Sequence, residues 1–191
     1  MPTTTVRSLS ALAALAWLVV GGYGVWEILV EDSGDDWETS YTIFTCALAL
    51  GSILSVLAVR NVSSAAGRAP MRSIGLGLCV LGVVITVVGA WALPLWMTLL
   101  AAGFALVAAS GSAWRRPVAL LAASHLLGMG ALFVGIAAEV GRVDEYGDHP
   151  AAFGIGLVAT AAATLVSLQQ LGRGVEAGAP GGAPRVGATA A

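Results

Sequence analysis

The chain has 191 residues, of which 58% are hydrophobic and 10% charged, and its formal net charge is −2. This composition excludes an ordinary soluble domain, in which about 25% of residues carry charge. The small negative charge also gives no general attraction toward nucleic acid, so no nucleic-acid partner is predicted.

Six apolar runs follow one another along the chain, each near the length of about 20 residues that an α-helix needs to cross a bilayer. They lie at about residues 9–30, 41–59, 74–93, 95–114, 118–140 and 151–171. The sequence therefore predicts an all-α fold, a bundle of six transmembrane helices spanning residues 1–171. Residues 172–191 are rich in Gly, Ala and Pro, which predicts a disordered cytoplasmic tail.

The connections between these runs are short, so sequential helices are expected to pack antiparallel in an up-down bundle. Pro94 is expected to break the chain between the third and fourth runs. Small residues let helix backbones approach closely inside a membrane. Close packing is therefore predicted at the glycines of the third and fifth runs, namely Gly75, Gly77, Gly82, Gly89, Gly128, Gly130 and Gly135.

The basic residues are all arginine, and every one except Arg142 falls on the same side of a six-span topology. The acidic residues concentrate on the other side, in the loops after the first and fifth runs. By the positive-inside rule, the arginine side is cytoplasmic. The sequence predicts a multi-pass protein of the cell membrane with both termini in the cytoplasm.

An ionisable group at membrane depth is a functional candidate, because burying it there is expensive. Glu27 lies near the outer end of the first run, and Tyr23, Glu27 and Glu31 share one helix face at spacings of four. Glu27 is either a general acid or an interfacial side chain that reaches water. Glu139 is either a second acid or an outer-surface ion-pair partner. If the first and fifth spans are neighbours, Glu27 and the loop that contains Asp148 can converge on one pocket. Two carboxyl groups in unlike environments can then divide the acid and base roles.

His125 lies near the middle of the fifth run. One interpretation is a neutral imidazole that is hydrogen-bonded to a neighbouring helix, and the other is a contact with substrate. A haem held between two histidines needs a second histidine at depth, whereas His149 lies outside the runs. A metal ion lacks further ligands at suitable spacing, so neither a cofactor nor a metal site is predicted.

The segment Tyr23-Gly-Val-Trp26-Glu27-Ile-Leu resembles the Trp-Glu segment of the small integral-membrane terpene cyclases of meroterpenoid and indole-terpenoid pathways. The resemblance implies metal-independent cyclisation of a linear or epoxidised prenyl substrate. Glu27 would match the acid that starts the reaction, and Glu139 or Asp148 would be the second acid.

Such a reaction needs an apolar cavity whose aromatic faces stabilise a carbocation. Tyr23, Trp26, Tyr146 and His125 are the predicted substrate contacts. Further aromatic side chains that could line the cavity are Trp17, Phe44, Trp91 and Phe133.

Two other classes of function fit the same sequence. One is the substrate-binding subunit of a membrane transporter, in which small residues such as Ala11 and Ala14 touch a partner subunit. The other is a non-catalytic membrane assembly protein. The partners predicted are thus the lipid bilayer and a hydrophobic small molecule, and the sequence indicates no oligomeric state.

Overall fold

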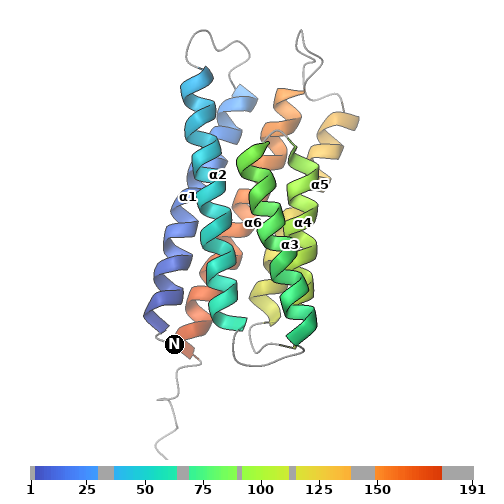
Figure 1. The fold of residues 1–191 in the computed structure, drawn as a ribbon. Helices are drawn as coiled ribbons and strands as arrows, with labels where there is room; N and C mark the ends of the chain where they lie inside the picture. Colours follow the sequence, from blue (N-terminus) through green and yellow to red (C-terminus); the bar gives the residue numbers. More distant parts are fainter. Residues whose placement is uncertain are drawn as a thin grey trace, which may run out of the picture.

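The structure is a computed structural model and describes residues 3–29, 37–63, 69–89, 92–111, 115–138 and 149–177. Within these residues the chain forms six α-helices that run alternately up and down (Figure 1). Five helices of this part of the chain are long and apolar enough to cross a membrane, which confirms the predicted all-α membrane bundle. The helices are α1 (Thr3–Leu29), α2 (Trp37–Ser63), α3 (Ala69–Val88), α4 (Leu93–Ala109), α5 (Arg115–Ala137) and α6 (Pro150–Ala177).

The fourth helix is shorter than expected. α4 has 17 residues and is therefore about 25 Å long, against a hydrocarbon thickness of about 30 Å. The apolar run had predicted a helix to residue 114, but the helix ends at Ala109. Gly111 adopts the left-handed conformation, with φ of 95°, that commonly terminates a helix.

The turn between α3 and α4 also lies earlier than predicted. The backbone N–H of Ala92 donates to the carbonyl oxygen of Gly89 at 2.9 Å, and α4 begins at Leu93. Pro94 is the second residue of α4 and not the point where the chain breaks. The first turn of a helix tolerates proline because the N–H groups there have no partner within the helix.

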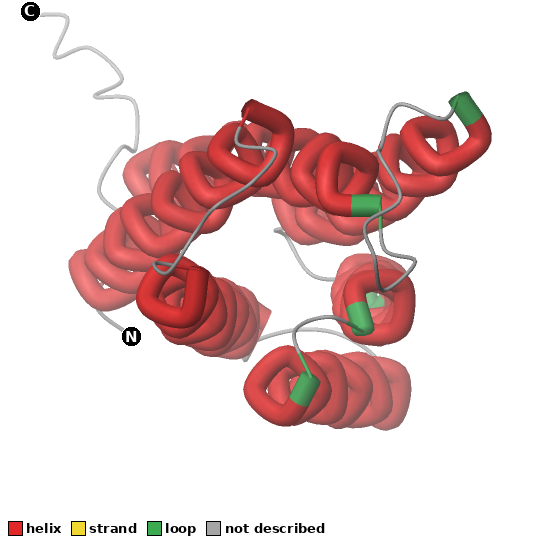
Figure 2. The backbone as a smooth tube through the Cα atoms, turned by 90° about the horizontal axis from the view of Figure 1, so that it is seen from above, coloured by secondary structure: helices red, strands yellow, loops and turns green. Residues whose placement is uncertain are grey.

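The six helices form a ring in chain order. Each helix packs against its neighbours in sequence, and α6 returns to pack extensively against α1. The contact between α2 and α3 is the smallest of the six (Figure 2). The predicted antiparallel arrangement is confirmed, and the α1–α6 contact closes it.

Large side chains fill the interior of the ring. Trp17, Phe44, Trp96 and Phe104, which come from α1, α2 and α4, are completely buried. The outside carries exposed leucine and valine side chains, among which Val88 is 81% exposed. An apolar exterior of this kind suits contact with lipid tails rather than water.

Several of the predicted glycines do allow close packing. A Cβ built at Gly75 lies only 2.7 Å from the carbonyl oxygen of Gly103 on α4. A Cβ built at Gly128 overlaps the side chain of Thr160 on α6. The prediction is wrong at Gly77 and Gly130, where a built Cβ meets no described atom within 4 Å. The spacing of glycines in the sequence and the composition of a helix do not distinguish a glycine that faces a neighbouring helix from one that faces outward.

The charged residues divide between the two ends of the bundle. The described arginines lie near the end that holds Thr3 and Ala177, while Glu27 lies near the opposite end of α1 (Figure 1). α6 continues to Ala177, so its helix extends into the segment for which a disordered tail was predicted. Residues 178–191 lie outside the described part of the chain.

Candidate functional site

The candidate site lies near the C-terminal end of α1. Glu27 is half-buried there, two residues before the helix ends at Leu29. The phenol of Tyr23, one turn earlier, interacts with the carboxyl group of Glu27. The spacing of four residues places both side chains on one face of the helix.

α6 packs closely behind this face. A Cβ built at Gly154 lies 3.0 Å from the Cβ of Glu27, and one built at Gly24 lies 2.8 Å from the carbonyl oxygen of Gly154. The two glycines therefore let the backbones of α1 and α6 approach where Glu27 begins. The base of the Glu27 side chain is consequently held by a rigid helix crossing.

Five aromatic side chains from three helices form what we call the aromatic cluster: Tyr23 and Trp26 on α1, Tyr41 and Phe44 on α2, and Phe153 on α6. The ring of Tyr23 stacks on that of Phe44 with 4.3 Å between centroids, and its centroid is 5.4 Å from that of Trp26. Phe44 also contacts Tyr41 at 5.9 Å and Phe153 at 6.0 Å. Because Tyr23 belongs to the cluster and also binds Glu27, an acid adjoins a set of aromatic rings.

Some predicted site residues come together here, and others do not. Tyr23, Trp26 and Glu27 lie close together, and Phe44 joins them. Phe133, expected to line the same cavity, is 53% exposed on the outside of α5 and does not. Glu139, Tyr146, Asp148 and Trp91 lie outside the described residues, so their approach to Glu27 stays a prediction.

The predicted convergence of Glu27 and Asp148 required α1 and α5 to be neighbours. α1 packs mainly against α2 and α6, not against α5. The segment that contains Asp148 precedes α6 directly in the sequence, however, and Phe153 in the first turn of α6 belongs to the aromatic cluster. Phe153 was not among the predicted site residues. Only its place four residues after His149, just after the acidic segment of the sequence, could have suggested it.

His125 occupies a second polar position, in the centre of the ring. Its side chain is 1% exposed, and its ring centroid lies 5.7 Å from Trp17, 6.2 Å from Trp96 and 5.6 Å from Phe104. Trp17 precedes Glu27 by ten residues on α1, which corresponds to about 15 Å along the helix. The predicted substrate contacts therefore divide between two places in the bundle.

The imidazole of His125 is oriented from within its own helix. Nδ1 lies 2.8 Å from the carbonyl oxygen of Leu121, so it carries the hydrogen and donates it. The hydrogen bond expected to a neighbouring helix is thus made to α5 itself. Ser124, whose Oγ lies 2.9 Å from Oγ1 of Thr164, links α5 to α6 instead. Nε2 has no hydrogen-bond partner in the described part of the chain.

The described residues contain no group of three His, Cys, Asp or Glu side chains close enough to hold a metal ion. Comparisons of the chain with protein-family models, with curated proteins and with solved structures find no match.

Proposed function

We propose that this membrane protein is an enzyme that starts the cyclisation of a linear isoprenoid by protonating it from Glu27. The observation that supports this proposal is the position of the Glu27 carboxyl group beside Tyr23, at the edge of the aromatic cluster. It combines a proton donor with the rings that a developing carbocation requires. The resemblance of the Trp26-Glu27 segment to membrane terpene cyclases agrees with the same chemistry.

The neighbouring phenol suits a carboxylic acid that gives up its proton. In the proposed site the phenol of Tyr23 would donate to one oxygen of Glu27 and leave the proton on the other oxygen available to a substrate. This proton adds to an epoxide oxygen or to an alkene carbon and produces a carbocation. A second alkene of the same molecule attacks the cation, a carbon–carbon bond closes the ring, and loss of a proton from a neighbouring carbon completes the reaction. The product has the same mass as the substrate.

The aromatic cluster would stabilise the cation during ring closure. The face of an aromatic ring carries the negative part of its quadrupole and attracts a cation within about 6 Å. Phe44 is completely buried, and it connects rings from α1, α2 and α6. An apolar wall of this kind also keeps water from capturing the cation.

The base that accepts the last proton is proposed from the sequence. Glu139 and Asp148 come from the segment that precedes α6, and α6 packs against α1 beside Glu27. Either carboxylate would return the proton to solution or to Glu27. The two acids would then divide the donor and acceptor roles.

The test compares membranes that contain equal amounts of the wild type and of Glu27→Gln. Each is incubated with linear and terminally epoxidised prenyl compounds and examined by mass spectrometry for products of unchanged mass and altered retention. Glu27→Gln keeps the shape of the side chain but removes its acidic proton, so we expect conversion to fall by at least about 10²-fold, the usual contribution of a general acid.

Glu31→Gln is the matched control, because it removes an acid one turn further along the sequence. We expect it to keep wild-type conversion. Equal conversion by wild type and Glu27→Gln would exclude Glu27 as the proton donor. If the wild type converts no compound and instead co-purifies with an ATPase pair, the transporter-subunit alternative replaces the enzyme.

A further inference from the structure

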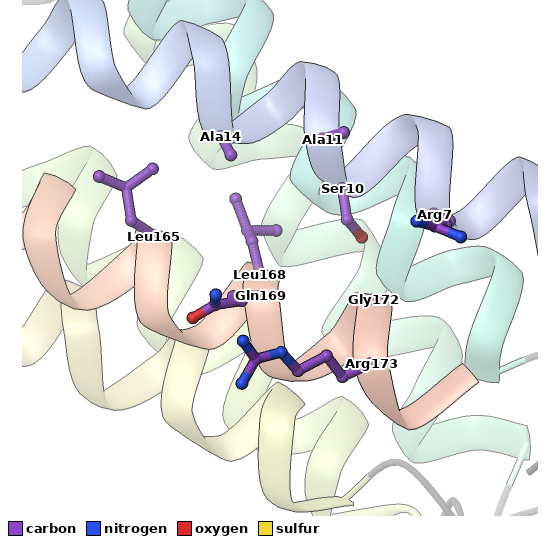
Figure 3. Close-up of a pocket in the computed structure, with 9 residues that line it drawn as sticks. All are labelled: Arg7, Ser10, Ala11, Ala14, Leu165, Leu168, Gln169, Gly172 and Arg173. Carbon is purple, nitrogen blue, oxygen red and sulfur yellow. The ribbon is translucent and has the colours of Figure 1, made fainter. Parts of the chain in front are cut away.

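A groove lies between α1 and α6, at the end of the bundle opposite Glu27. Its volume is about 360 Å³, and it is lined by residues from the first part of α1 and the last part of α6 (Figure 3). It is remote from the aromatic cluster, because Arg7 on its rim precedes Glu27 by twenty residues, or about 30 Å of helix. The groove is therefore separate from the proposed reaction site.

The charge of the groove is positive. Arg7 on α1 and Arg173 on α6 both line it, together with the amide of Gln169, and none of its described lining residues is acidic. Figure 3 shows Arg173 and Gln169 side by side on α6, across the groove from α1. Two guanidinium groups and an amide offer several hydrogen-bond donors to one anion, and guanidinium is especially suited to phosphate.

Ser10 supplies a second and independent observation. Its side chain is 4% exposed, and its hydroxyl, which points from α1 toward α6, has no hydrogen-bond partner in the described part of the chain (Figure 3). Ser55, Ser124 and Ser167, which are also buried, donate to a carbonyl three or four residues earlier in their own helix, whereas Ser52, like Ser10, has no partner in the described part of the chain. Ser10 thus retains a donor at the groove that the helix does not use.

The rest of the groove is apolar and extends toward the middle of the bundle. Ala11 and Ala14 form its α1 wall, and Leu165 and Leu168 form its α6 wall. Leu165 precedes Arg173 by eight residues, so the apolar part continues for about 12 Å beyond the charged part. Gly172 also lines the groove, between Leu168 and Arg173 on α6.

We propose that this groove binds one anionic phospholipid of the surrounding leaflet. Its phosphate lies between Arg7 and Arg173 and accepts hydrogen bonds from Ser10 and Gln169, and one acyl chain follows the wall formed by the alanines and leucines. A free phosphate ion would leave the apolar walls unused, and an apolar helix of a partner protein would leave the hydroxyl of Ser10 without an acceptor. A lipid phosphate with its chain occupies both parts of the groove.

The test uses the full-length protein, purified in detergent and stripped of lipid. Phosphatidylglycerol and phosphatidylcholine are titrated separately, and native mass spectrometry measures the population that carries one lipid. We expect the wild type to retain phosphatidylglycerol in preference to phosphatidylcholine. Loss of each arginine should weaken retention about fivefold, the effect of about 1 kcal/mol per basic residue at a membrane surface, so R7Q/R173Q should lose about 25-fold.

Two matched controls separate the groove from general surface charge. Arg116→Gln removes an arginine from the same end of the bundle but outside the groove, and it should bind lipid as the wild type does. Gly172→Leu fills the groove without changing its charge and should weaken retention, whereas Gly77→Leu adds the same side chain on α3 and should not. Matching elution in size-exclusion chromatography checks that each variant remains folded.

Four results would overturn the proposal. They are equal retention by R7Q/R173Q and wild type, an equal loss in Arg116→Gln, equal retention of the two lipids, and displacement of the lipid by inorganic phosphate in excess. Co-purification of a membrane protein that R7Q/R173Q leaves unchanged and Gly172→Leu abolishes would assign the groove to a helix of that partner instead. Activity in the prenyl assay is not a readout of this experiment, so the two proposals fail independently.

Discussion

Most of the described hydroxyl groups inside the bundle form hydrogen bonds within their own helix. Trp17 makes a hydrogen bond that instead joins two helices. Its indole Nε1 donates to Oγ of Ser55 on α2 at 3.2 Å, and Ser55 in turn donates to the carbonyl oxygen of Gly51 at 2.7 Å. Gly51 makes room for the indole, because a Cβ there lies 3.1 Å from Nε1. The α1–α2 contact therefore contains a directional hydrogen bond as well as apolar packing.

A double-mutant cycle of Trp17→Phe and Ser55→Ala measures this hydrogen bond. We expect a coupling of about 0.6 kcal/mol in the free energy of unfolding, the average for such bonds in membrane helices. Denaturation by sodium dodecyl sulfate in mixed micelles, followed by circular dichroism, gives the four stabilities. Exactly additive losses in the two single variants would show that the hydrogen bond contributes nothing beyond packing.

Tyr23→Phe tests the partner of the proposed acid. The variant keeps the ring that stacks on Phe44 but loses the hydroxyl that binds Glu27. We expect the prenyl conversion to fall about tenfold, less than in Glu27→Gln, because the proton donor remains and only its orientation is lost. Trp26→Phe, which keeps a ring at the edge of the cluster, is the control. An equal fall in both variants would assign the effect to the aromatic cluster.

At the scale of the helices, the glycines decide where the elements meet. α5 approaches α6 at Gly128, next to Thr160 and the carbonyl of Gly156, and again at Gly135 beside Ala152. Gly130, half a turn from Gly128, points away from the contact. The difference between neighbouring glycines on one helix offers a clean comparison.

Gly128→Ala should destabilise the bundle by about 1–3 kcal/mol, the usual cost of overpacking. Gly130→Ala should be neutral or slightly stabilising, because alanine favours the helix and meets no described atom. Thermal unfolding in detergent compares the two variants with the wild type. Equal melting temperatures for both would mean that α5 and α6 separate easily at this point.

The helices were predicted correctly where burial in hydrocarbon alone determines that a segment is helical. Six apolar runs correspond to six helices, because a chain in lipid must satisfy its backbone hydrogen bonds internally. The ends of the helices were not predicted as well. Hydropathy did not locate the end of α4 at Ala109, the turn before Leu93 or the extension of α6 to Ala177, because these depend on local backbone conformation.

The candidate site was likewise predicted only in part. Tyr23, Trp26 and Glu27 share one helix, so their relation followed from spacing. Phe153 and Gly154 complete the site from α6, and the sequence contained no sign that the last helix returns to the first. A contact between elements so far apart in the chain leaves no local pattern.

At the scale of the whole molecule, charge is distributed unevenly along the axis of the bundle. The described arginines lie at one end of the bundle, near Thr3 and Ala177, and Glu27 lies near the other. The positive-inside rule assigns the arginine end to the cytoplasm. This orientation is open to a direct test.

Fusions to the C-terminus measure the orientation. We expect green fluorescent protein to fluoresce there and alkaline phosphatase to be inactive, because the first folds in the cytoplasm and the second requires export. Phosphatase inserted between residues 30 and 36 should be active, since this segment follows α1 at the end away from the described arginines, and the rule places that end outside. The reversed pattern would place the arginines outside and contradict the rule for this protein.

The return of α6 to α1 has a consequence for biosynthesis. α1 is synthesised before α6, yet the face of α1 that carries Gly24 and Glu27 packs against Gly154. Until α6 has been inserted, this face has no α6 backbone to cover it. A nascent chain that stops before residue 150 therefore leaves the ionisable side chain of Glu27 facing lipid, which is a signal that membrane quality control can recognise. The proposed site would then be complete only after α6 has packed against α1.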